Sequence, residues 1–272
     1  MRILKLSSKV TVLLLAIMLP LTVCHALDIS IEPLNAQRRV GNHVTVYIYA
    51  TDAIDLISMG VKVSFNPRVL EAVEAHKYEN FDYGWVMDAD ADPDSTYDQF
   101  TLPAVEIVNY VDNNDPADDI GEVIMIGGRL MGSQTAGLSS EKLLLGWIVF
   151  KAIGIGDSPL DIDLAKYHPQ DPDQTFDNFV RLGGQVDEPL NVPGEFGTFC
   201  VKPDACEADS NGDGLVNLLD FGKLRADYGK DCTLSPEAPC VADFNGDGIV
   251  NLLDFGALRR DYGRNDCLTC YP

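Results

Sequence analysis

The feature that most constrains this chain is a duplicated segment near its C-terminal end. Residues 208–222 read ADSNGDGLVNLLDFG and residues 242–256 read ADFNGDGIVNLLDFG, at an offset of 34 residues. Aspartate, asparagine and glycine dominate the first half of each copy, and apolar residues dominate the second half. This composition predicts a polar loop followed by a helix, twice over.

Each copy places oxygen-bearing side chains at loop positions 1, 3, 5, 9 and 12, with glycine at position 6. Calcium takes roughly 6–8 oxygen ligands, and a loop that curls around the ion supplies them alternately, with a backbone carbonyl at position 7. Two loops of the same type predict two bound calcium ions; Asx-rich turns that hold no metal are the alternative. The predicted ligands are Asp209, Asn211, Asp213, Leu215, Asn217 and Asp220 in the loop 209–220, and Asp243, Asn245, Asp247, Ile249, Asn251 and Asp254 in the loop 243–254.

A helix is expected after each loop but not before it, unlike in a paired EF-hand. A duplicated loop with one following helix resembles a dockerin module, here over residues 206–267. The resemblance implies that the leucine pair at the start of each helix recognises a protein partner, with arginines at the rim; the alternative is that these leucines fill the module's core. The residues concerned are Leu218, Leu219, Leu252 and Leu253, with Arg225, Arg259 and Arg260.

Six cysteines lie within residues 200–272, and none lies between residues 27 and 199. An even set in one small segment predicts a disulfide framework in an exported protein. The cysteines stand in register with the repeats: one lies three residues before each first ligand, and one follows each helix. This register predicts the pairs Cys206–Cys232, Cys240–Cys267 and Cys200–Cys270.

Residues 27–186 have strand character. Apolar residues alternate from His43 to Ala50, and further β-rich runs cover 56–65, 99–111, 122–130 and 143–152. Because no long stretch repeats apolar residues at helical spacing, two packed antiparallel sheets are expected. Proline and glycine residues in the segment 187–199 predict a linker to the second domain, which covers residues 200–272.

Several of these strands resemble those of a cohesin. The segments that carry the resemblance are 27–34, 41–44, 61–71 and 145–152. The expected fold is therefore mainly β, a cohesin-like jelly-roll sandwich followed by a small α-helical dockerin. The resemblance implies a non-catalytic adaptor that binds a cohesin or dockerin on another chain in a calcium-dependent pair, in assemblies that degrade polysaccharide. A chain with both halves of such a pair could also associate with itself, head to tail.

A carbohydrate-binding sandwich, tethered by the dockerin, is the alternative function. Tyr47 and Tyr49 face away from Val46 and Ile48, and together with Trp85 or Trp147 they could stack on sugar rings. The simpler reading is that these aromatic side chains cover the second face of the sandwich. An enzyme is less favoured, because the histidines show no metal-ligand spacing and the sequence has no G-x-S-x-G motif.

The N-terminal 26 residues have the pattern of an export signal. Three basic residues precede the apolar run 10–21, and Cys24-His25-Ala26 offers a cleavage site. The protein is thus expected to be secreted or held at the cell surface, with lipid attachment at Cys24 as the less favoured variant. A net charge of −22 argues against nucleic acid as a partner. The acidic segments 88–94 and 112–119 are expected to be solvated loops rather than further calcium sites.

Overall fold

The computed structural model describes residues 27–81, 105–128, 136–165, 167–168, 171–175, 179–182, 195–232 and 240–267. The predictions for the export signal and Cys24, for Trp85, for the segment 88–94 and for Cys270 fall outside these residues. Neither α-helix in the described ranges combines the length and the apolar composition that crossing a bilayer requires.

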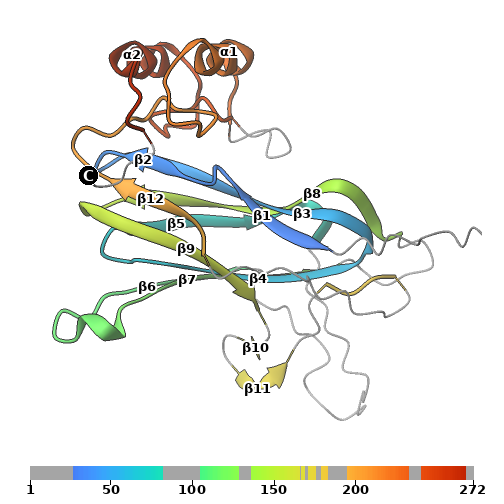
Figure 1. Cartoon of the computed structure of the whole chain (residues 1–272). Coiled ribbons are helices and arrows are strands. Elements are labelled where there is room, and N and C mark those ends of the chain that lie inside the picture. The colour runs from blue at the N-terminus through green and yellow to red at the C-terminus, as the bar shows by residue number, and fades with distance from the viewer. Residues whose placement is uncertain are drawn as a thin grey trace, which may run out of the picture.

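Two β-sheets pack face to face to form the N-terminal domain (Figure 1). The first sheet has the order β1-β3-β8-β5 and comprises β1 (Asp28–Glu32), β3 (His43–Leu56), β8 (Leu138–Ala152) and β5 (Leu70–Lys77). The second has the order β2-β12-β9-β4-β7-β6 and comprises β2 (Ala36–Arg38), β12 (Glu195–Val201), β9 (Gly156–Leu164), β4 (Ser58–Phe65), β7 (Ile120–Gly128) and β6 (Val105–Tyr110). Smaller elements are η1 (Glu79–Phe81), η2 (Pro116–Asp118) and the pair β10 (Tyr167–His168) and β11 (Asp171–Thr175).

The core of the sandwich follows from side-chain alternation along the strands. Val44, Val46 and Ile48 on β3 are buried against residues of the opposite sheet. Phe65 of β4 and Phe150 of β8 meet edge to face, with ring centroids 5.0 Å apart. Apolar side chains from both sheets thus form one continuous core, as two packed sheets require.

The predicted β runs 56–65, 122–130 and 143–152 correspond to β4, β7 and β8, and β6 lies within the run 99–111. Antiparallel pairing dominates, and the β2–β12 pair is parallel. The predicted fold class, a mainly β sandwich followed by a small helical module, is confirmed.

The predicted linker 187–199 is wrong at its C-terminal end. Residues 195–199 belong to β12, which pairs with both β9 and β2. Gly197 lies in the predicted linker, where glycine indicates a turn. In the structure a Cβ there would lie 1.7 Å from Leu34 O, so glycine is needed for the close approach of two chain segments. The sandwich therefore extends to Val201, past the predicted boundary.

The C-terminal module contains the helices α1 (Leu218–Asp227) and α2 (Leu252–Asp261). As predicted, no helix precedes either loop in the described residues 202–217 and 240–251. Val216 and Val250 are buried at the centre of the module. The segment after each helix pairs with the loop of the other repeat: Gly263 N donates to Val216 O at 2.9 Å, and Gly229 N donates to Val250 O at 2.8 Å. The two repeats thus complete each other.

Two of the three predicted disulfide pairs, Cys206–Cys232 and Cys240–Cys267, are wrong. The structure joins Cys206 to Cys267 and Cys232 to Cys240, with Cα separations of 5.2 and 5.6 Å. Cys200 is also disulfide-bonded, but its predicted partner lies outside the described residues.

The exchange between repeats explains the observed pairing. Cys232 follows the first helix, yet its N–H donates to Gly248 O at 2.8 Å in the second loop. Cys267 follows the second helix, and its N–H donates to Gly214 O at 3.3 Å in the first loop. Each cysteine after a helix is therefore placed beside the start of the other repeat, which register along the sequence could not reveal.

Candidate functional site

The first loop folds around the carboxylate of Asp209. Its Oδ2 accepts a hydrogen bond from Gly214 N at 2.9 Å, and its Oδ1 accepts one from Asp213 N at 3.2 Å. Asn211 Oδ1 also accepts from Asp213 N, and Asp213 Oδ1 accepts from Leu215 N at 2.9 Å. These bonds gather the side chains of positions 1, 3 and 5 on the inside of one turn.

The second loop repeats this arrangement bond for bond. Asp243 Oδ2 accepts from Gly248 N at 2.9 Å, and Asp243 Oδ1 accepts from Asp247 N at 3.2 Å. Asn245 Oδ1 accepts from Asp247 N at 3.1 Å, and Asp247 Oδ1 accepts from Ile249 N at 3.0 Å. The identical sequence pattern thus gives two equivalent loops.

The aspartate at position 12 ties each loop to its helix. Asp220 is fully buried, and its two oxygens accept from Ser210 N at 2.9 Å and Asn217 N at 2.8 Å. Asp254 is also fully buried and accepts the corresponding bonds at 2.8 Å each. Each of these aspartates is the N3 member of a capping box, so it stabilises the start of its helix as well as closing the loop.

The asparagine at position 9 caps the helix. Asn217 Oδ1 accepts from Leu219 N, and Asn251 Oδ1 accepts from Leu253 N, both at 2.7 Å. The sequence predicted these residues as ligands, whereas the structure uses their oxygens as N-caps. A ligand at position 9 often acts through a water molecule, so the capping role is compatible with an ion in the loop.

The charges in the loops fit a hard divalent cation. Burial raises the pKa of Asp209 and Asp243, and the neighbouring carboxylates raise it further, while backbone N–H groups oppose the shift. Each loop therefore concentrates like charges that a bound cation would offset. The donor set contains oxygen alone, which suits calcium rather than metals that prefer sulfur or imidazole.

The spacing of the loop carboxylates differs from a closed coordination sphere. Among the described residues, the one group of three potential metal-binding side chains with ligand atoms within 4.8 Å of one another is Cys206, Asp266 and Cys267, and its sulfurs form a disulfide. The loop carboxylates are spread further apart, bonded to loop N–H groups. Ligand distances of about 2.3–2.6 Å to calcium would draw them inward.

The four leucines predicted to recognise a partner are exposed. Leu218 and Leu219 are 71% and 63% exposed, and Leu252 and Leu253 are 69% and 64% exposed. The alternative, that these leucines fill the core of the module, is therefore wrong. Both helices lie on the side of the module that faces away from the sandwich (Figure 1).

Further apolar side chains extend this face, and sequence reasoning did not assign them to it. Phe221 and Phe255, three residues after the first leucine of each helix, are each 40% exposed. Helical spacing places residues i and i+3 on neighbouring positions of one face, which was the available signal.

The three predicted rim arginines separate into two groups. Arg225 and Arg259 are exposed. Arg260 is also exposed, and in addition it donates from Nη2 to Glu207 Oε2 at 2.8 Å and from Nε to Asp261 Oδ1 at 3.0 Å. Arg260 therefore binds buried acids beneath the helices while 38% of its side chain stays exposed, and its place at the rim of the partner surface stays a prediction.

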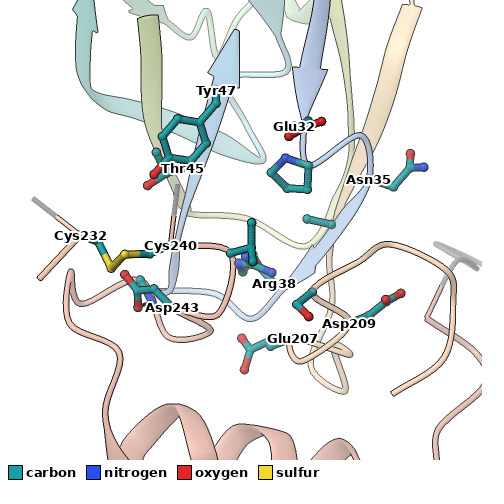
Figure 2. A pocket seen from close by; sticks show the side chains of 15 residues that line it. Glu32, Asn35, Arg38, Thr45, Tyr47, Glu207, Asp209, Cys232, Cys240 and Asp243 are labelled. Carbon is teal, nitrogen blue, oxygen red and sulfur yellow. Dashed lines mark hydrogen bonds between the residues drawn. A yellow bond between two sulfur atoms is a disulfide. The ribbon is translucent and has the colours of Figure 1, made fainter. Parts of the chain in front are cut away.

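A pocket lies between the loops 209–220 and 243–254 and the edge of the sandwich. Figure 2 shows Arg38 near its centre, with Glu207 and Asp243 on the side of the C-terminal module. Burial lowers the pKa of Arg38, and the negative charges of Glu207 and Asp243 oppose that shift. The sequence analysis did not predict this contact between the two domains. No sequence motif indicates that Glu207 faces the sandwich or that Gln37 faces the C-terminal module.

The tyrosines proposed to stack on sugars are covered. Tyr47 and Tyr49 are each 6% exposed, so neither offers an open ring face. Lys142 Nζ lies 4.1 Å from the Tyr49 ring centroid, and Trp147 stacks on His76 with ring centroids 5.0 Å apart. The simpler reading, that these aromatic side chains cover the second sheet face, describes the two tyrosines better.

The side chain of Arg68 binds both ends of the acidic segment 112–119. Arg68 pairs with the carboxylate of Asp119 and donates from Nη2 to Asp112 O at 2.6 Å. Backbone hydrogen bonds lower the pKa of Asp112. These bonds occupy the acidic groups with Arg68 and with the backbone of the loop itself.

The comparisons with known proteins concern the two domains separately. Residues 207–261 match the family model of the dockerin type I domain. No curated protein matches the chain. Type I dockerin domains are calcium-binding modules.

Among solved structures, the chain is similar to a type I cohesin–dockerin complex from Clostridium thermocellum. The identity is 12%, the TM-score is 0.40, and the match covers 65% of this chain and 100% of that one. It is also similar to a type II cohesin module from an adaptor scaffoldin of Acetivibrio cellulolyticus, at 12% identity and a TM-score of 0.40, covering 66% of this chain and 92% of that one.

The family match spans the loops 209–220 and 243–254 and both helices, and it begins at the buried Glu207. Residues 207–261 of this chain therefore form a type I dockerin domain, which directly follows a β-sandwich.

Proposed function

We propose that this chain is a non-catalytic adaptor whose dockerin domain binds a protein partner through the exposed face of α1 and α2. The observation that carries the proposal is the equal exposure of the leucine pair in both repeats. Large apolar side chains gathered on one face mark interaction surfaces in soluble proteins. Burial of each leucine in a complex would contribute about 1.5–3 kcal/mol.

The partner is expected to have a complementary apolar groove. The contact residues of this face are leucine and phenylalanine, so the driving force is burial of apolar area rather than hydrogen bonding. Arg225 and Arg259 at the edge would add charge selectivity toward an acidic rim on the partner.

Two calcium ions, one in each loop, would hold the two helices in the geometry that the partner recognises. The ligands would be the oxygen groups of loops 209–220 and 243–254. The buried Asp220 and Asp254 connect each ion site to the first turn of a helix, and that turn carries the leucine pair. Ion binding and presentation of the leucines are thus expected to be linked.

The partner lies on another molecule. The helices face away from the chain's own sandwich, so the sandwich cannot cover them within one molecule (Figure 1). We further propose that the sandwich is a cohesin-like receptor domain, that the protein is exported to the outside of the cell or its surface, and that it acts in polysaccharide breakdown. The sequence likeness of its strands to those of a cohesin supports the receptor role, and the disulfides support export. A chain with both domains could also join copies head to tail.

The test is calcium-dependent capture on the immobilised oxidised chain, using the native secretome and purified cohesin domains as binding candidates. Wild-type protein should retain a partner in calcium and release it in EGTA. Because the two repeats present equivalent surfaces, the test variant is the double substitution Leu218→Asp with Leu252→Asp. Retention of the same partner by this variant, or in EGTA, would contradict the proposal.

A further inference from the structure

Strand β2 carries a buried glutamine that reaches into the dockerin domain. Gln37 is 3% exposed; its Nε2 donates to Cys267 O at 2.5 Å, and its Oε1 accepts from Cys206 N at 2.9 Å. One side chain of the sandwich thus bonds to both residues of the disulfide that closes the dockerin. Separation of the domains would break these bonds, and a buried amide with both ends paired orders the surfaces it joins.

Glu207 joins the same two domains from the dockerin side, and it is also 3% exposed. Its Oε1 accepts from two groups of the sandwich, Arg39 N at 3.0 Å and Asn42 Nδ2 at 2.6 Å. Its Oε2 accepts from Arg260 Nη2 of α2 at 2.8 Å. The Glu207 carboxylate therefore accepts hydrogen bonds both from the sandwich and from α2.

The second calcium loop contacts the sandwich at a position where the first loop does not. A Cβ on Gly246 would lie 2.6 Å from His43 Cβ and 2.7 Å from His43 O, whereas the equivalent Gly212 has nothing within 4 Å. Tyr47 of β3 and Cys240, just before the second loop, line the same pocket between the two domains. The two loops are equivalent in sequence but differ in their surroundings.

The connection between the domains is short and bonded. Strand β12 ends at Val201, and the dockerin disulfide begins at Cys206. Within this connection, Lys202 N donates to Arg38 O at 3.0 Å, and Ala205 N donates to Lys202 O at 3.3 Å. While these bonds are intact, the connection restricts movement of the dockerin away from the sandwich.

We propose that the sandwich docks onto the second calcium loop of its own dockerin, so that ion binding in this loop and docking of the two domains strengthen each other. Docking restrains the loop next to His43, which lowers the conformational entropy lost when calcium binds. Linkage then requires that calcium favour docking by the same factor. At the equivalent Gly212 the first loop lacks this contact, so the two ion sites are expected to differ in affinity. The inference assumes the calcium binding proposed above.

Hydrogen exchange of the oxidised full chain tests the effect of calcium on docking. The amides of Arg39 and Cys206 donate to the partner domain, so their exchange reports the interface directly. Removal of calcium with EGTA should speed exchange at both amides about fivefold or more. The amide of Val46, within the β3–β8 pair, is the internal reference and should be unchanged.

Calorimetric titration with calcium tests the reverse direction, using substitutions in the sandwich. Gln37→Ala and Asn42→Ala remove bonds to the dockerin and touch no ion ligand. Each should weaken one of the two calcium sites by about fivefold or more and leave the other within twofold. Lys62→Ala, on the distant strand β4, is the control and should change neither site.

A matched glycine pair separates docking from local strain. Gly212 and Gly246 have φ values of +71° and +70°, so alanine carries the same backbone penalty at both. Gly246→Ala should also speed exchange at Arg39, because its methyl group meets His43, whereas Gly212→Ala should not.

The outcomes distinguish this inference from the proposed function. Absence of any calcium binding by wild-type protein would refute both. Calcium binding that Gln37→Ala and Asn42→Ala leave unchanged, with EGTA-insensitive exchange at Arg39, would overturn the inference alone.

Discussion

Cys206 and Cys267 are joined across the whole dockerin domain, 61 positions apart in sequence and 5.2 Å apart at Cα. The first cysteine precedes the first loop, and the second follows the last helix. The bond therefore closes the domain, and Gln37 of the sandwich binds to both of its residues. The second disulfide, Cys232–Cys240, closes a short segment between the repeats.

Peptide mapping under non-reducing conditions should recover Cys206 linked to Cys267 and Cys232 linked to Cys240. Loss of the long-range bond should cost more stability, because a loop of 61 residues gains more conformational freedom than one of 8. The loop-entropy relation gives about 4 kcal/mol for Cys206→Ser with Cys267→Ser and about 2.5 kcal/mol for Cys232→Ser with Cys240→Ser. Urea unfolding of the two double variants measures the difference; equal losses would contradict it.

Asp254 is expected to stabilise the dockerin even when calcium is absent. It is fully buried and accepts backbone hydrogen bonds from both ends of its loop. Asp254→Ala leaves these donors unpaired and should lower stability by about 1–3 kcal/mol in EGTA. Thermal unfolding in EGTA isolates this capping role from ion binding, and the equivalent Asp220→Ala should behave alike. An EGTA melting temperature equal to that of wild type would show that the aspartate acts through the ion alone.

The leucines of each helix should divide into binding and folding residues. Leu218→Ala and Leu252→Ala remove exposed side chains and should change stability by less than about 0.5 kcal/mol. Leu224→Ala and Leu258→Ala, on the same helices, remove side chains that are 2% exposed and should cost about 2–5 kcal/mol. Denaturant midpoints of the four variants make the comparison, and partner capture by the first two, combined in one chain, should fall while their fold is retained.

The local chemistry of the dockerin was predictable from the sequence. The spacing of Asp209, Asp213 and Asp220 predicted a folded loop, and the apolar residues after it predicted the helix that begins at Leu218. These features arise from residues close together in the chain, where short-range hydrogen bonds decide the conformation.

Features that depend on tertiary contacts were not predictable in the same way. Gly197 looks like a linker residue in sequence, because its close approach to Leu34 O exists only in the folded sandwich. The sequence suggests that Cys232 pairs with the cysteine that begins its own repeat. The exchange of segments between the repeats, which rules this pair out, is a property of their packing. The bonds of Gln37 join residues more than 160 positions apart, and no local pattern signals them.

Tyr47 should make the protein less stable at high pH. Burial raises its pKa from 10.0 to about 12 in the folded state, so the unfolded chain loses this proton at lower pH than the native protein does. Between pH 10 and 12 the unfolded state therefore binds fewer protons, and the free energy of unfolding falls as pH rises. Below pH 10 the contribution is complete. A shift of this size corresponds to about 3 kcal/mol across the range.

Tyr47→Phe removes the titrating group and should flatten the dependence of stability on pH between 10 and 11.5. Urea unfolding at a series of pH values, for wild type and variant, measures the two slopes. Tyr110→Phe is the control, because Tyr110 is 52% exposed and its removal should leave the slope as in wild type. Equal slopes for wild type and Tyr47→Phe would mean that the Tyr47 hydroxyl is solvated rather than buried in the pocket between the sandwich and the dockerin.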